Sequence, residues 1–122
     1  MKALLIIFFS CIVIYTGYRV YRSIMLSDDL ERAIQRGAVI LDVRTAREYA
    51  SGHIEGSINI SLGTIRERFS DLNPDKVYIT TCSHGLRSIK AESLLKENGF
   101  KHVYNGGAWE DLNKIGTKQK IK

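Results

Sequence analysis

The feature that most constrains this chain is an uncharged run of 16 residues near its amino end, from Ala3 to Tyr18. The run extends to Tyr21 if Arg19 directs its guanidinium towards water. A helix that crosses a bilayer needs about 20 residues, so residues 3–21 are predicted to associate with a membrane as a transmembrane helix. No cleavage motif of small residues follows the run, which favours an uncleaved anchor over a cleaved secretory signal.

The residues around this run bear on its orientation. Three regularly spaced tyrosines resemble the aromatic belt of a membrane interface, namely Tyr15, Tyr18 and Tyr21. Arg19 and Arg22 lie on the carboxyl side of the run, and Lys2 lies on the other side. The positive-inside rule therefore favours a cytoplasmic domain, with the opposite face as the alternative because Lys2 and the amino terminus also favour staying inside.

The rest of the chain is long enough for one domain with a real core. The net charge is +5, but from residue 27 onward Lys and Arg exceed Asp and Glu by only two. This excess is too small for a nucleic-acid partner. We expect an anchor or uncleaved signal at residues 1–23, a domain at 24–115 and a basic, solvated tail at 116–122. The tail is defined by Lys118, Lys120 and Lys122.

Strand-like and helix-like segments alternate after the apolar run. Strands are predicted at residues 38–43, 57–60, 77–80 and 101–104. Helices are predicted from Ser27, with Glu31 completing a capping box, to a stop at Gly37, and then at residues 45–49, 62–69, 87–98 and from Gly106 through Leu112. Such alternation predicts an α/β fold with a parallel sheet covered on both faces. Ligands of these folds bind beyond the carboxyl ends of the strands.

Cys82 stands at the end of a predicted strand, before a short polar loop and a helix. Loop amides and the positive end of the helix dipole would meet at its sulfur, lower the pKa of the thiol and hold an anion beside it. The alternative is a buried structural cysteine, but Gly85 and Arg87 in the loop favour the reactive thiol. Cys11 lies in the apolar run, so a disulfide with Cys82 is implausible. No spacing of Cys and His indicates a metal, and we expect no cofactor.

Four stretches together resemble the rhodanese homology domain, in particular the small single-domain bacterial sulfurtransferases. They are Leu41 to Arg44 with Glu48, Gly52 to Asn59, the Cys82 loop, and Gly106-Gly107 with Trp109. The resemblance implies a three-layer α/β fold with a central parallel sheet of about five strands. It also implies an enzyme whose cysteine takes sulfane sulfur from a donor such as thiosulfate and passes it, through a persulfide, to a thiol or cyanide. With the anchor, it places the protein at a bacterial inner membrane.

The resemblance also gives roles to residues. Cys82 is the expected nucleophile, and the amides of residues 83–87 are expected to cradle its persulfide. The expected substrate-binding residues are Ser83, His84, Gly85, Leu86, Arg87 and Ser88. Arg87 has two open roles, because it can steady the anionic donor or thiolate, or tether the loop to a carboxylate.

Four further residues are expected to support the loops rather than to act on substrate: Asp42, Arg44, Glu48 and His53. Asp42 and Arg44 are predicted to belong to an ion network, and Glu48 is predicted to pair with Arg44 or Arg47. His53 is assigned to loop scaffolding, because sulfur transfer to an ionised thiol needs no general base.

Two other functions compete with sulfur transfer. A cysteine phosphatase needs Cys-x5-Arg to surround a phosphate, whereas Arg87 gives Cys-x4-Arg, and arsenate reduction would need the longer loop too. A non-enzymatic persulfide carrier or rhodanese-like binding module stays open, although such modules usually lack the cysteine that this chain keeps. The sequence identifies no protein acceptor.

Overall fold

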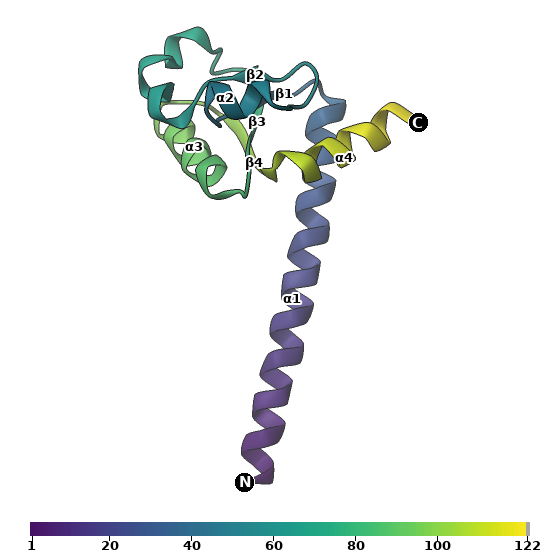
Figure 1. Cartoon of the computed structure of the whole chain (residues 1–122). Helices are drawn as coiled ribbons and strands as arrows, with labels where there is room; N and C mark the ends of the chain where they lie inside the picture. Colours follow the sequence, from purple (N-terminus) through teal and green to yellow (C-terminus); the bar gives the residue numbers. More distant parts are fainter. Residues whose placement is uncertain (122) are drawn as a thin grey trace.

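Four parallel strands form one sheet in the order β2-β1-β3-β4 in the computed structural model, which describes residues 1–121 and side chains through residue 116 (Figure 1). The strands are β1 (Val39–Asp42), β2 (Ile58–Asn59), β3 (Val77–Cys82) and β4 (His102–Ala108). Asp42 pairs with Asn59 on one side and with Thr81 on the other. The carboxyl ends of all four strands therefore lie at one edge of the sheet.

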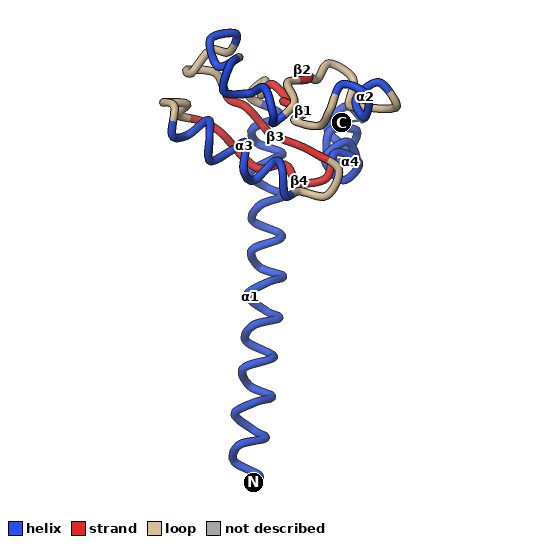
Figure 2. Tube along the Cα trace, turned by 60° about the vertical axis from the view of Figure 1, so that its left-hand side comes forward, coloured by secondary structure: helices blue, strands red, loops and turns tan. Residues whose placement is uncertain are grey.

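Helices cover both faces of this sheet and give three layers (Figures 1 and 2). The helices are α1 (Lys2–Gln35), α2 (Ala46–Ala50), α3 (Leu86–Glu97) and α4 (Trp109–Ile121), with 3-10 helices at Leu62–Glu67 and Phe69–Asp71. The end of α1 and α4 cover one face, where Leu30, Ala33, Ile79 and Leu112 are buried together. On the other face α3 and the 3-10 helices enclose a core centred on Leu41, Val43, Ile65, Tyr78 and Leu95.

The sheet has four strands among the described residues, so the expectation of about five was wrong by one. The chain before β1 is a single helix of 34 residues, and the described chain after β4 is helical. The link between β2 and β3 forms 3-10 turns instead of the predicted regular helix at 62–69. No described segment is therefore left to form another strand. Ile65 is buried there as predicted, and Leu62 and Phe69 are half-buried.

The predicted helix start at Ser27 was also wrong, because α1 runs through this position without a break. Extending an existing helix adds a hydrogen bond per residue without the cost of a new nucleus. No Gly or Pro interrupts the chain between Tyr18 and Arg36, so the local capping signal is not used. Ser27 instead donates to the carbonyl of Ser23 at 3.1 Å. The predicted stop at Gly37 is confirmed, since φ is 84° there and the helix ends at Gln35.

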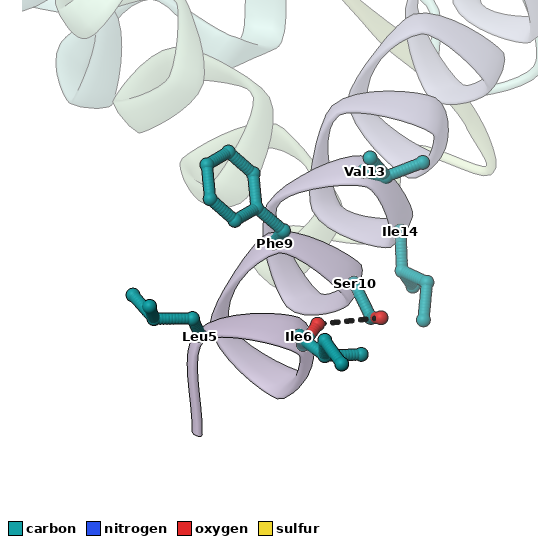
Figure 3. Close-up of a pocket in the computed structure, with 6 residues that line it drawn as sticks. All are labelled: Leu5, Ile6, Phe9, Ser10, Val13 and Ile14. Carbon is teal, nitrogen blue, oxygen red and sulfur yellow. Dashed lines mark hydrogen bonds between the residues drawn. The ribbon is translucent and has the colours of Figure 1, made fainter. Parts of the chain in front are cut away.

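The first half of α1 projects away from the domain (Figure 1). Figure 3 shows the side chains of Leu5, Phe9 and Val13 extending from this exposed part of α1. The hydroxyl of Ser10 donates a hydrogen bond to the carbonyl of Ile6 at 2.8 Å. Among the described residues, α1 is the one helix long and apolar enough to span a membrane. It continues past residue 23, the predicted end of the anchor, and α4 continues past residue 116, the predicted start of the tail. The side chains of the predicted basic tail, Lys118, Lys120 and Lys122, lie outside the described residues.

Gly106 and Gly107 belong to β4 and not to the last helix, which begins at Trp109. A Cβ atom on Gly106 would lie 2.7 Å from the Ile79 side chain, 2.8 Å from the Leu112 side chain and 2.9 Å from the Thr80 carbonyl oxygen. Glycine is therefore required where β4 passes between β3 and α4. The pairing of β3 with β4 shifts at this point, between Thr80 and Cys82.

Candidate functional site

Cys82 is the last residue of β3, so its side chain lies at the carboxyl edge of the sheet. The chain then turns through residues 83–85 into α3, which begins at Leu86. Gly85 precedes this helix with φ of 99°, a left-handed conformation that glycine adopts without steric cost. The turn directs the Gly85 N–H back to Cys82, where it donates to Sγ at 2.9 Å.

The thiol itself is enclosed, with Cys82 only 1% exposed. Burial raises the pKa of the Cys82 thiol, because it disfavours the thiolate. Hydrogen bonds from the Ser88 hydroxyl and from the backbone N–H groups of Ser88, Gly85 and His84 more than offset burial, and the pKa is lowered from its ordinary value. The arrangement therefore favours an anionic sulfur held mainly by backbone donors.

Ser88 connects the thiol to the neighbouring strand. Its Oγ lies 3.6 Å from Cys82 Sγ, 2.9 Å from the Gly85 carbonyl oxygen and 2.6 Å from Oδ1 of Asn105. Its single proton can be directed to only one of these acceptors at a time. Asn105 Oδ1 also accepts from the Gly107 N–H at 3.0 Å. Sequence reasoning missed Asn105, although an amide residue before two glycines near the end of a strand is a usable signal.

Glu48 and Arg87 form an ion pair that joins the loop after β1 to the Cys82 loop. The two guanidinium nitrogens donate to the two carboxylate oxygens at 2.8 and 2.9 Å. Ser83 Oγ lies 3.3 Å from the same carboxylate and accepts from Arg87. Hydrogen bonds from Arg87 hold the pKa of Glu48 well below its usual range, and Glu48 raises the pKa of Arg87. Of the two roles open to Arg87, the geometry favours the tether.

The partner predicted for Glu48 was wrong. Arg44 reaches only the backbone carbonyl of Glu48, at 3.3 Å, and the carboxylate turns to Arg87. The cause is local, because Glu48 closes a capping box with Thr45 at the start of α2. Its Oε1 accepts from the Thr45 N–H at 3.2 Å, and this fixes the carboxylate on the side of α2 that faces the Cys82 loop.

Asp42 and Arg44 form a second ion pair, and this one is buried. Their exposed fractions are 0% and 4%, and Arg44 donates to the two Asp42 oxygens at 2.7 to 3.0 Å. Arg44 also donates to the Gly52 carbonyl at 2.7 Å and lies 4.9 Å from the Trp109 ring. The pair thus connects β1, the following loop and α4 as a structural network.

The three other predicted residues have exposed side chains. His53 stacks on the ring of Tyr49 at 3.7 Å, and its Nδ1 lies 2.7 Å from the Tyr49 carbonyl oxygen. This contact fits the scaffolding role predicted for it. His84 and Leu86 are exposed. Within the part of the chain that the structure describes, no group of three or more His, Cys, Asp or Glu side chains could hold a metal ion.

The fold and the site define an α/β protein with a cysteine-centred loop at the carboxyl edge of its sheet. The rhodanese-like domain model matches residues 26–111, and the chain belongs to this family. It is 34% identical to the uncharacterized protein YqhL of Bacillus subtilis (strain 168), over 98% of this chain and 96% of that protein. It is 38% identical to the thiosulfate sulfurtransferase PspE of Escherichia coli (strain K12), over 59% and 71% respectively.

Solved structures agree with this assignment. A rhodanese with anions from E. coli is 32% identical and aligns over 61% of this chain and 89% of that chain, with a TM-score of 0.57. A rhodanese-related protein from Thermoplasma volcanium is 34% identical over 72% and 88%, with a TM-score of 0.60. The family and the names of these relatives support sulfur transfer as the general activity of the chain.

Proposed function

We propose that this protein is a membrane-anchored sulfurtransferase that carries sulfane sulfur on Cys82 as a persulfide. The observation that carries the proposal is the 2.9 Å hydrogen bond from the Gly85 N–H to Cys82 Sγ at the start of α3. A sulfur anion at this position meets peptide donors and the positive end of a 12-residue helix. Thiosulfate or a similar sulfane compound is the proposed donor, and a thiol or cyanide is the proposed acceptor.

In the first step the Cys82 thiolate attacks the outer sulfur of thiosulfate. A bond forms between the two sulfur atoms, and the bond from the outer sulfur to the sulfite group breaks. Sulfite leaves with the electron pair, and the negative charge moves to the terminal sulfur of the new persulfide. The backbone donors of His84, Gly85 and Ser88 are suited to this charge, because they are fixed before the reaction begins.

In the second step the acceptor attacks the terminal sulfur, and Cys82 leaves as a thiolate. Cyanide becomes thiocyanate, and a thiolate becomes a persulfide, so that no proton has to move at the sulfur atoms. The reaction therefore needs a stabilised thiolate as leaving group and no general base. This agrees with a site in which His53 contacts Tyr49 and not the thiol.

The Glu48–Arg87 pair argues against the cysteine phosphatase. Such an enzyme needs a free guanidinium that can bind two phosphate oxygens beside the cysteine. Both terminal Arg87 nitrogens instead bind Glu48, and the Cys-x4-Arg spacing is one residue shorter than a phosphatase needs. We therefore expect sulfur transfer without hydrolysis of phosphate esters.

The location that we propose is the bacterial inner membrane, with residues 3–21 as a single-pass anchor. The exposed apolar part of α1 supports it. Arg19 and Arg22 favour a cytoplasmic domain, and the periplasmic face is the alternative. Proteolysis of sealed spheroplasts against inverted membrane vesicles distinguishes the two faces.

The test of the activity is thiosulfate:cyanide sulfurtransfer by the full chain in detergent, with Cys82→Ser as the control. We expect activity in the native chain and a loss of more than about 10³-fold in the variant, because the nucleophile is removed. Mass spectrometry after thiosulfate treatment should show a gain of about 32 Da on Cys82, one sulfur atom. Turnover of a phosphate ester faster than sulfur transfer would overturn the assignment.

A persulfide carrier is the second candidate. The chain is 45% identical to the putative sulfur carrier protein YrkF of B. subtilis, over 54% of this chain and 36% of that protein. The enclosed thiol also suits storage of sulfur. A carrier would show the mass gain on Cys82 without catalytic turnover to cyanide, so the same two measurements separate the candidates.

A further inference from the structure

The carboxyl edge of the sheet lies beside the membrane-proximal part of α1. Asn105, Gly106 and Gly107 of β4 line a groove of about 610 Å³ together with Tyr15 and Tyr18. Val103 and Tyr104, earlier in β4, line a groove with Asp29 and Leu30, later in α1. The later residues of β4, nearer the Cys82 site, therefore lie beside earlier residues of α1, nearer its apolar half.

The figures show the same relation for the Cys82 loop. In both views the link from β3 to α3 lies on the side of the domain from which the bare part of α1 extends (Figures 1 and 2). About 20 helical residues cross a hydrocarbon core of about 30 Å. Counted from Lys2, these residues end at Tyr21. The groove that β4 shares with α1 runs from Tyr15, about 9 Å inside the end of this span, to Leu30 beyond it, so the groove straddles the membrane interface.

Exposed apolar side chains stand on this side, next to the Cys82 loop. Leu86 is 79% exposed and Ile89 is 50% exposed, in the first turns of α3. Residues at i, i+3 and i+4 share one face of a helix, so the exposed Lys90 belongs to the same face. Ile89 lines a groove with Arg22 of α1, which brings this face close to the end of the proposed span.

The charges on this side match an anionic lipid surface. Arg19 and Arg22 line the groove beside the end of β4, and Lys90 accompanies the two apolar residues of α3. Asp29 and Glu92 also line the groove with Ile89. Asp29 lies seven residues beyond Arg22, about 10 Å farther from the membrane along the helix. Aliphatic side chains with flanking cations are typical of surfaces that contact lipid headgroups.

We propose that Leu86, Ile89 and Lys90 form a second membrane contact that seats the Cys82 loop at the lipid headgroup layer. The proposal rests on the membrane anchor proposed above. Its consequence is that sulfur donor and acceptor reach Cys82 along the bilayer surface. An acceptor thiol on a membrane protein at headgroup height would then meet the persulfide directly.

The test attaches an environment-sensitive fluorophore to a cysteine introduced by Leu86→Cys. The full chain carries Cys11→Ser and Cys82→Ser, so that the fluorophore labels position 86 alone. The labelled chain is reconstituted in vesicles of phosphatidylcholine and phosphatidylglycerol. A spin label on the lipid headgroup is the quencher. The matched control is Asp75→Cys, an exposed position before the amino end of β3. If the Cys82→Ser background does not fold, Cys82→Ala in the same chain replaces it.

We expect strong quenching at position 86 and little at position 75. A second variant has seven residues inserted after Arg22, which adds about two helical turns. The insertion moves the domain about 10 Å away from the membrane and keeps nearly the same orientation about the helix axis. It should abolish quenching at position 86. Equal and weak quenching at both positions in membrane-bound chains without the seven-residue insertion would overturn the second contact and leave the anchor intact. Failure of the chain to float with vesicles would overturn the anchor, and the contact with it, while leaving the Cys82 chemistry untouched.

Discussion

Two loops meet at the carboxyl edge of the sheet, and they are held by different parts of the chain. The loop after β1 is held by side chains, above all Arg44 against Asp42 and the Gly52 carbonyl, and Glu48 in its capping box. The loop after β3 is tied to the first loop through Arg87 and Glu48, but it holds the sulfur with its own backbone, as Gly85 turns an N–H onto Cys82. The first loop should therefore depend on residue identity, whereas the second should depend on the path of its backbone.

The difference follows from what each loop must do. A scaffold can be built from specific polar side chains, because they have only to bind one another. In the proposed function the second loop receives and releases a sulfur atom, which needs donors that stay in place while the charge moves from one sulfur to the next. Peptide N–H groups meet this need, and side-chain substitutions that keep the turn should be tolerated.

The largest effect that we expect in this comparison is on stability, from Arg44→Gln. The substitution leaves Asp42 buried without its cation, which costs about 3–5 kcal/mol. Urea unfolding of the full chain in detergent measures it. Arg68→Gln is the matched control, because the pair of Arg68 with Asp71 is exposed and should contribute less than about 1 kcal/mol. Equal losses in both variants would mean that the buried pair does not organise the first loop.

The next largest effect should come from Gly85→Ala, which tests the backbone of the second loop. At φ of 99° a Cβ atom costs about 1–2 kcal/mol, and relaxation of the turn would move the N–H away from Cys82. We expect kcat/KM for thiosulfate to fall about tenfold or more. Gly63→Ala is the control, since φ is not positive there and no atom lies within 4 Å of the added Cβ. Unchanged kinetics for Gly85→Ala would contradict the backbone model.

Ser88→Ala tests the one side chain that acts on the thiol. Loss of its hydroxyl should raise the pKa of Cys82 towards its ordinary value, because burial is then less well offset. Below this pKa the thiolate fraction falls, so the acid limb of the kcat/KM profile should move to higher pH, and the two profiles should converge at alkaline pH. Ser83→Ala, which removes contacts with Glu48 and Arg87, should leave the limb unmoved. If neither substitution moved the acid limb, Ser88 would have no role in lowering the pKa of Cys82.

The smallest effect should come from His84→Ala. Only the backbone N–H of His84 contributes to the site, and its side chain is exposed. We expect kcat/KM within about twofold of the native value at every pH, a ratio worth less than about 0.5 kcal/mol. A large loss with retained fold would show that the imidazole takes part, and the contrast between the two loops would then weaken.

Local signals predicted much of this structure. The strand before Cys82, the short helix predicted at residues 45–49 and the stop at Gly37 depend on neighbouring residues, and the structure has each of them. The continuous helix through Ser27 was missed because helix propagation overrides a local start signal. The strand at Gly106 was missed because glycine was read as a helix boundary, while the close packing that requires it comes from Ile79 and Leu112.

The contacts that join the two loops were the least predictable. Glu48 and Arg87 are 39 residues apart, and no spacing rule relates them. Their pairing depends on the register of β1 with β3 and on how α2 and the start of α3 are oriented at the edge of the sheet. The position of Asn105 beside Ser88 has the same origin, since β4 comes next to β3 only in the folded sheet.

The absence of a break in α1 between Lys2 and Gln35 has a mechanical consequence. The last turns of α1 are part of the core, through Leu30 and Ala33, and the first turns would be part of the lipid phase. A spanning helix tilts to match the thickness of the hydrocarbon layer. If α1 spans the membrane as proposed, there is no hinge to absorb such a tilt, so a change in lipid composition would lean the whole domain, and bilayer thickness would become a variable of the proposed sulfur transfer.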